Sequence, residues 1–175
     1  VIVVAKTDPA KGAKGTSLLA VDTSMKGFTK GKRLKKMGLK GQDTAELFFD
    51  NVEVPAGNLI GQENNGFIYL MQELPWERMQ IAIGAIAKAE AAIEWTKTYV
   101  TERKVFGKPV ANFQNTRFRL ARMATDLTAA RLLVYRAAWE KDQGAERVTV
   151  AAAMAKAFAT EAAQEAGDQA VQIFG

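Results

Sequence analysis

The sequence predicts an α+β protein in which part of a β-domain precedes three antiparallel helices of a bundle. Two observations support this order. Short apolar stretches separated by Gly, Pro, Asp and Lys fill residues 1–60, as in antiparallel strands and their turns. From about Gly66 the apolar residues recur three and four positions apart, which is the period of packed helices. The change of period predicts a β-region over 1–60 and a helical domain over 61–175.

The first region holds three stretches typical of strands, at 1–5, 17–21 and 44–54. In the third stretch the apolar positions change parity at Asp50-Asn51, which predicts a bulge or a turn there. Pro55 then ends the strand region, because proline cannot donate to a sheet ladder.

Three segments after Gly66 carry apolar stripes at helical spacing. The breaks between them are expected at residues 107–109 and 143–144, where Gly and Pro interrupt the pattern. Alanines between the larger residues would let the helices approach closely. The expected stripes consist of Met79, Ile83, Ile86 and Ile93; of Leu120, Met123, Leu127, Ala130 and Val134; and of Val150, Met154, Phe158 and Ala162.

The composition excludes several kinds of chemistry. An apolar content of 48% is enough to form packed cores, and no apolar run is long enough to cross a bilayer, so we expect no membrane span. The chain has no cysteine and no histidine, which excludes disulfides, thiolate metal sites and imidazole bases. Proton transfer would therefore depend on carboxylates, lysines or tyrosines.

The net charge of +5 invites an anionic partner, and six basic residues are crowded into residues 30–40. The ordinary explanation of such a run is a solvated, exposed loop. No nucleic-acid-binding motif accompanies it, so we expect no nucleic-acid partner. The basic residues are Lys30, Lys32, Arg33, Lys35, Lys36 and Lys40.

A carboxylate follows a proline in Leu74-Pro75-Trp76-Glu77-Arg78. Its structural explanation is a helix start, since proline is favoured in the first turn and a glutamate there complements the helix dipole. Its functional explanation is a base, because burial beside apolar side chains raises the pKa of a carboxyl group towards that of a working base. The residues alone leave both explanations open.

A second group of candidates begins with Arg103 and Lys104, in ERKVFGKPV. Cations are favourable at a helix C-terminus without any ligand, and an arginine beside a glycine turn can also hold a diphosphate bidentately. Gln114 and Gln172 lie near expected helix ends, where they would cap backbone groups or bind a ligand. No glycine-rich phosphate loop of the dinucleotide or P-loop type is present.

Several separated motifs resemble the FAD-dependent acyl-CoA dehydrogenase family, in its long-chain type. They are MGLKGQDTAELFFDNVEVP at 37–55, ELPWERM at 73–79, ERKVFGKPV at 102–110 and AVQIFG at 170–175. The match keeps one register over essentially the whole chain. It implies an internal piece comprising the later part of an antiparallel, barrel- or sandwich-like middle β-domain and three helices of a C-terminal four-helix bundle. The start without Met and the unclosed C-terminal helix agree with this expectation.

The resemblance implies a proton removed from the carbon alpha to a thioester and a β hydrogen transferred as hydride to flavin N5, giving a trans-2-enoyl-CoA. LPWERM resembles the arrangement in which Glu77 is the base and Arg78 a supporting cation, with the acyl chain near Leu74. In many members the base lies nearer the C-terminus, beyond Gly175.

The same resemblance implies contacts to the FAD of a neighbouring subunit. Arg103, through the diphosphate, and Phe106 resemble two such contacts, and Gln114 resembles a further contact on the ADP side. Gln172 and Gly175 begin a closing glycine motif that meets the same FAD. Val105 departs from the pattern, because many members have a hydroxyl residue there.

The expected partners are an acyl-CoA substrate, an electron-transfer flavoprotein as acceptor, and further copies in a homodimer or homotetramer. The expected compartment is a bacterial cytoplasm or the mitochondrial matrix. Three alternatives stay open. They are an acyl-CoA oxidase or flavin monooxygenase on the same fold, a non-catalytic assembly module, and a basic nucleic-acid binder.

Overall fold

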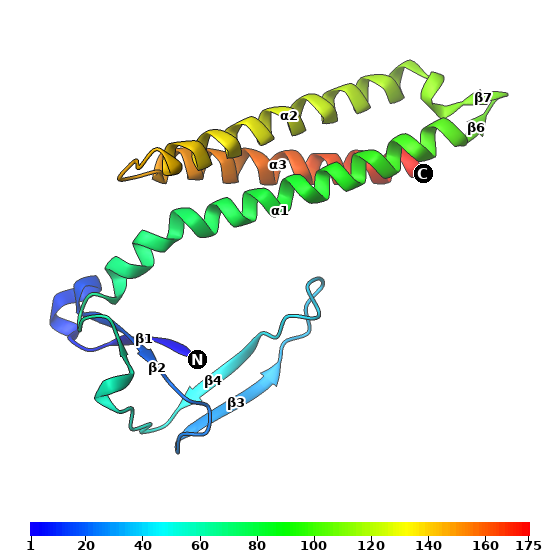
Figure 1. The fold of residues 1–175 in the computed structure, drawn as a ribbon. Coiled ribbons are helices and arrows are strands. Elements are labelled where there is room, and N and C mark those ends of the chain that lie inside the picture. The colour runs from blue at the N-terminus through cyan, green and yellow to red at the C-terminus, as the bar shows by residue number, and fades with distance from the viewer. The chain divides into compact units, whose positions relative to one another are not determined.

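The computed structural model describes all residues from Val1 to Gly175, and they form two compact units. The first unit is Val1–Gln72 and the second is Glu73–Gly175. The first unit contains two sheets and the start of a long helix, and the second contains the remainder of that helix, two more helices and a small hairpin (Figure 1).

The larger sheet of the first unit is antiparallel and has the order β1-β2-β5. Its strands are β1 (Ile2–Lys6), β2 (Thr16–Ala20) and β5 (Leu59–Ile60). The register pairs Val3 with Leu19 and Leu18 with Ile60. The consecutive residues Thr16, Ser17 and Leu18 of the central strand β2 are all buried, so the best-packed side chains of this sheet lie on that strand.

A hairpin of β3 (Phe28–Arg33) and β4 (Ala45–Phe49) forms the second sheet. Its register shifts between Lys30 and Arg33, which marks a bulge in the basic run. The carboxylate of Asp43 partly offsets this charge, lying 2.8 Å from Arg33 and 3.7 Å from Lys30.

Two expectations for this unit need correction. The basic run was expected to be loop only, but its first half is strand β3, because pairing with β4 supplies backbone hydrogen bonds that composition does not reveal. The expected strand over 44–54 ends at Phe49. The turn predicted at Asp50-Asn51 is confirmed, since Asn51 has a φ of +50° and leaves the extended conformation.

Helix α1 (Gly66–Glu102) begins where the sequence period changes. Gly66 permits a close approach, because a Cβ at this residue would lie 2.9 Å from the backbone of Ser17. Pro75 lies inside the helix and not in its first turn, so the helix-start explanation of the Pro75–Glu77 pair is wrong. The missing N–H of Pro75 costs the helix one i→i−4 hydrogen bond.

The second unit is an antiparallel three-helix bundle built from α1, α2 (Gln114–Asp142) and α3 (Thr149–Phe174) (Figure 1). The predicted breaks are confirmed: a small hairpin of β6 (Lys104–Val105) and β7 (Lys108–Pro109) joins α1 to α2, and a turn containing Gly144 joins α2 to α3. The three short 3₁₀ segments are Pro9–Gly15, Ala56–Asn58 and Val110–Asn112.

The core of the bundle is built largely from alanine. Met79, Ala82, Ala85 and Ile86 of α1 meet buried residues of both other helices, and Ala89 and Ile93 continue the contact. The stripe predicted for α2 is confirmed by its buried residues Met123, Ala130 and Val134, with Leu120 and Leu127 packed beside them.

The stripe predicted for α3 is wrong. Val150 and Met154 are mostly exposed, and the buried residues are the alanines Ala152, Ala155 and Ala159. Because α2 and α3 pack closely, only small side chains fit between them. Ile83 of α1, also expected in the core, is 49% exposed. Ile83, Val150 and Met154 therefore lie on outward surfaces of their helices.

The predicted fold class is confirmed, with small antiparallel sheets followed by bundle helices and without a closed barrel. None of the helices combines the length and the apolar character that crossing a bilayer requires.

Candidate functional site

The five residues for which the sequence predicts cofactor contacts lie at one end of the bundle, which we call the cofactor end after that prediction: Arg103, Phe106, Gln114, Gln172 and Gly175. Arg103 follows the last residue of α1, and its N–H donates to the carbonyl of Tyr99 at 2.8 Å. Gln114 is the first residue of α2, and Gln172 lies in the last turn of α3. In Figure 1 the C-terminus lies beside the end of α1, where the β6–β7 hairpin begins.

The β6–β7 hairpin turns at Phe106 and Gly107, and both have positive φ, +51° and +79°. Two central residues with positive φ are the requirement of a type I′ turn, which suits Asn-Gly far better than Phe-Gly. A bulky side chain in this conformation is strained by about 1–2 kcal/mol. The Phe106 ring is nevertheless 92% exposed, so burial in this chain does not compensate for the strain. Such a combination points to a role in binding.

The polar groups of the cofactor end are available for a ligand. Arg103 is exposed, and its guanidinium makes no ion pair or hydrogen bond within the chain. The side chains of Gln114 and Gln172 are likewise exposed and make no hydrogen bond within the chain. A free guanidinium, an exposed aromatic ring and two free amides fit the diphosphate and the polar groups of FAD.

Two neighbours of this group were not singled out in the sequence. Phe113 lies beside Phe106, with ring centroids 6.5 Å apart in an edge arrangement. The ammonium of Lys108 lies 4.4 Å from the centre of the Phe113 ring. The sequence indicates only that Lys108 belongs to a turn. Its contact with the Phe113 ring depends on the β6–β7 hairpin, which brings the two residues together.

The base position lies near the other end of α1. Leu74 is half-buried and is followed at three and four residues by Glu77 and Arg78, so the three share one side of the helix. Met79 is buried in the bundle core, and residues two apart lie on nearly opposite faces, so Glu77 faces away from that core. Its carboxylate makes no ion pair within the chain.

The burial expected around Glu77 is not provided by this chain. Glu77 is exposed, and the neighbouring Trp76 is 53% exposed. Met79 points into the core and Trp76 is turned by about 100° from Glu77, so of the expected apolar neighbours only Leu74 shares its side of the helix. Burial of this carboxylate away from water therefore requires groups other than those that this chain places around it.

The two groups of candidates are far apart. Glu77 and Glu102 belong to the same straight run of α1, which separates them by about 38 Å at about 1.5 Å per residue. One flavin held by Arg103 cannot also face Glu77 of the same chain.

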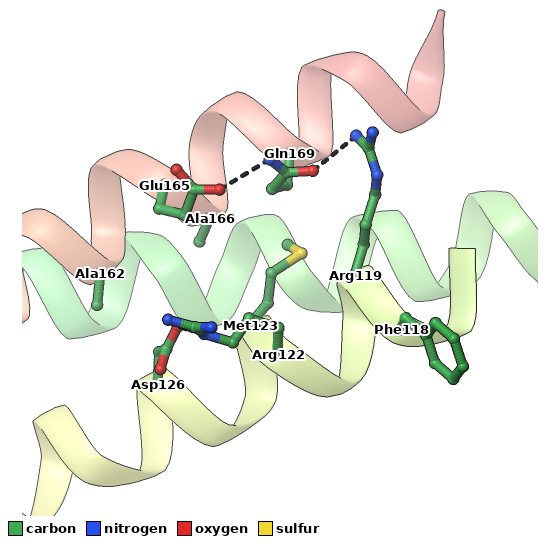
Figure 2. A pocket seen from close by; sticks show the side chains of 9 residues that line it. All are labelled: Phe118, Arg119, Arg122, Met123, Asp126, Ala162, Glu165, Ala166 and Gln169. Atoms are coloured by element: carbon green, nitrogen blue, oxygen red, sulfur yellow. Dashed lines mark hydrogen bonds and ion pairs between the residues drawn. The ribbon is translucent and has the colours of Figure 1, made fainter. Parts of the chain in front are cut away.

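A groove of about 300 Å³ lies between α2 and α3, but it contains none of the predicted site residues. Figure 2 shows a row of hydrogen-bonded polar side chains in the groove. Arg119 donates to Gln169 at 2.6 Å, and Gln169 donates to Glu165 at 2.8 Å. Asp126 lies 2.7 Å from Arg122 and raises the pKa of that guanidinium above its ordinary value. The four charged side chains of the groove thus all have hydrogen-bond partners within it, and Arg122 and Asp126 form an ion pair. No cluster of acidic side chains suited to a metal ion occurs in the chain.

Comparison with known proteins shows which family of proteins this chain resembles. Residues 64–175 match the family described as acyl-CoA dehydrogenase, C-terminal domain. The mitochondrial long-chain specific acyl-CoA dehydrogenase of Rattus norvegicus is 46% identical over 177 aligned positions, which include 100% of this chain and 41% of the relative.

Solved structures agree with the sequence relatives. The crystal structure of an acyl-CoA dehydrogenase from Geobacillus kaustophilus has a TM-score of 0.95 and 45% identity, covering 99% of this chain and 46% of the other. The structure of PigA with FAD and proline has a TM-score of 0.95 and 29% identity, covering 99% and 45%.

The chain spans less than half the length of these relatives. The motifs that suggested the family, the arrangement of sheets before a helical bundle, and the matches over nearly every residue all agree. The chain therefore belongs to the acyl-CoA dehydrogenase family, and residues 64–175 correspond to the C-terminal domain of that family.

Proposed function

We propose that the protein carrying this chain is an FAD-dependent acyl-CoA dehydrogenase that forms trans-2-enoyl-CoA from acyl-CoA thioesters in fatty-acid β-oxidation. The observation that carries the proposal is the cofactor end, where Arg103, whose guanidinium is free, precedes the strained, exposed Phe106 by three residues in a chain of this family. A bacterial cytoplasm or the mitochondrial matrix is the compartment in which such a protein would act.

At the cofactor end, Arg103 would hold the diphosphate of FAD through two parallel N–H donors. The ring of Phe106 would pack against the cofactor, which would offset the strain of its backbone. Gln114 would donate a hydrogen bond on the ADP side. Gln172 would donate to another polar group of the same cofactor, and Gly175 would let backbone approach the cofactor closely. Val105 has no hydroxyl to add a further hydrogen bond.

At the base position, a carboxylate oxygen of Glu77 would take the proton from the carbon alpha to the thioester. The chemistry that bound FAD would supply is that of an acceptor for the hydride from the β carbon. Arg78 would stabilise the negative charge near the base, and Leu74 would contact the acyl chain. The bound substrate would supply the apolar surroundings that the chain alone does not give Glu77.

The separation of about 38 Å along α1 supports assembly of the site from more than one copy. The flavin facing Glu77 would then be held by Arg103 of another subunit in a homodimer or homotetramer. An electron-transfer flavoprotein is the expected acceptor of the electrons.

Two other functions use the same features. An oxidase or monooxygenase on this fold would differ in what reoxidises the flavin. Production of hydrogen peroxide during turnover would distinguish the oxidase. A non-catalytic assembly module is favoured by exposed apolar residues such as Trp95, 70% exposed, and Trp139, 62% exposed.

The proposal is tested by anaerobic titration of the complete reading frame, purified with FAD, against a long-chain acyl-CoA. Bleaching of the flavin absorbance reports the chemical step. Glu77→Gln removes the base and keeps the size of the side chain, so we expect binding without bleaching. Glu73→Gln is the matched control, because Glu73 is an exposed carboxylate one helical turn earlier.

Three outcomes decide between the functions. Bleaching by the wild type and by Glu73→Gln, but not by Glu77→Gln, supports the dehydrogenase with Glu77 as base. Equal bleaching by all three proteins means that the base is a different residue. Failure of the wild type to retain FAD or to bleach supports the assembly module.

A further inference from the structure

Tyr99 joins the ends of two helices that are far apart in the sequence. Its hydroxyl donates to the main-chain carbonyl of Phe174 at 3.1 Å. The two rings are also stacked, with centroids 4.3 Å apart and planes inclined by 20°. The last turn of α1 is thereby tied to the last turn of α3.

The residues beside this contact are those of the cofactor end. Arg103 lies one turn after Tyr99, and its N–H donates to the Tyr99 carbonyl at 2.8 Å. Phe174 lies between Gln172 and Gly175 in the sequence. One tyrosine therefore connects the segment that carries Arg103 and Phe106 with the segment that carries Gln172 and Gly175.

The Tyr99–Phe174 contact adds to the buried packing at this end of the bundle. Val100, next to Tyr99 in α1, is 1% exposed, and the buried cluster nearest the cofactor end includes Ala170 of α3, about one turn before Phe174. Phe174 is 44% exposed, so the stack is a local contact at the rim. Helix ends fray readily unless they are held, and here the hydrogen bond and the stack hold both ends in one arrangement.

We propose that Tyr99 is a positioning residue of the FAD site. It holds Arg103 and the Gln172–Gly175 segment at the spacing that one cofactor requires, and it need not touch the cofactor. This inference rests on the proposed function. A preorganised pair of segments loses less conformational freedom on binding, so loosening the pair weakens FAD affinity without removing any cofactor contact.

The test measures the dissociation constant for FAD by quenching of flavin fluorescence in the complete reading frame. Tyr99→Leu removes both the hydrogen bond and the stack, and we expect about 10–100-fold weaker binding. Tyr99→Phe keeps the stack and should recover most of the loss, leaving about 2–10-fold. Tyr135→Phe is the control, because Tyr135 is 63% exposed and makes no hydrogen bond within the chain.

A double-mutant cycle with Arg103→Gln separates positioning from general destabilisation. If Tyr99 acts by positioning Arg103, Tyr99→Leu adds little further loss of FAD affinity once Arg103 is replaced. Fully additive losses would overturn the inference. Should Tyr99→Leu fail to fold, the cycle is run with Tyr99→Phe, and an affinity equal to that of the wild type then overturns it.

The single variants also separate this inference from the proposed function. Weaker FAD binding by Arg103→Gln together with unchanged binding by Tyr99→Leu rejects the role of Tyr99 and keeps the cofactor site. Unchanged binding by Arg103→Gln rejects the cofactor site, and the positioning role with it.

Discussion

Replacing Phe106 by asparagine should stabilise the fold while weakening the binding of FAD. Phe106 has a φ of +51° at the first central position of the β6–β7 turn. Relief of this conformation is worth about 1–2 kcal/mol, because asparagine tolerates the left-handed region. The ring is 92% exposed, so its removal costs little burial, and the lost edge contact with Phe113 costs about 0.5 kcal/mol.

The expected net gain is about 0.5–1.5 kcal/mol in the free energy of unfolding. For a unit of about 100 residues such as Glu73–Gly175, 1 kcal/mol corresponds to a rise in Tm of about 4–8 °C. The assay is thermal unfolding of the FAD-free protein, followed by circular dichroism at a helical wavelength, beside a fluorescence titration with FAD. Stability should rise and FAD affinity should fall.

Gly107→Ala is the matched control in the same turn. It adds a Cβ at a φ of +79° but keeps the Phe106 ring, so it should lower the free energy of unfolding by about 1 kcal/mol. A loss of stability in Phe106→Asn would refute the argument about strain. A gain of stability with unchanged FAD affinity would refute the role of the ring.

Two further predictions concern each unit separately. Ser17→Ala should lower the free energy of unfolding of the first unit by about 1–3 kcal/mol, measured by denaturant titration, because the buried Ser17 hydroxyl accepts from the Asn64 N–H at 2.7 Å. Ala155→Leu should lower that of the second unit by about 1–3 kcal/mol in the same assay, because Ala155 is fully buried between closely packed helices and the larger side chain overpacks the core.

Exposed neighbours provide the controls for these two variants. Thr23→Ala, on an exposed turn of the first unit, and Met154→Leu, at a position 50% exposed on α3, should each change the free energy of unfolding by less than about 0.5 kcal/mol. An effect of Ser17→Ala no larger than that of Thr23→Ala would mean that the hydroxyl is dispensable. A neutral Ala155→Leu would mean that α2 and α3 separate easily.

The sequence predicted the limits of the bundle helices well, because the residues that interrupt a helix are recognisable from their type alone. Gly107 and Pro109 interrupt the helical pattern between α1 and α2, and Gly144 interrupts it between α2 and α3. The structure has its two helix connections at these residues. The stripe of α2 was correct for a related reason, since its larger apolar residues are the ones that reach the core.

The faces of α3 could not be predicted in the same way. Periodicity locates an apolar stripe, but α3 has two, one of alanines and one containing Val150 and Met154. Which stripe is buried depends on the distance between the helices, and that distance is a property of the packed bundle. Strand β3 was missed for a similar reason, because its pairing with β4 is a tertiary contact.

The same distinction between local sequence and tertiary contacts applies to the candidate site. By itself the sequence determined the family, through motifs kept in one register, and it determined which residue types are available for chemistry, since histidine and cysteine are absent. Only the tertiary structure decided that Glu77 faces away from the core, that Phe106 is strained and exposed, and that Tyr99 meets Phe174 across 75 residues. Exposure, backbone strain and contacts between distant segments depend on where helices lie in space, and local composition does not specify those positions.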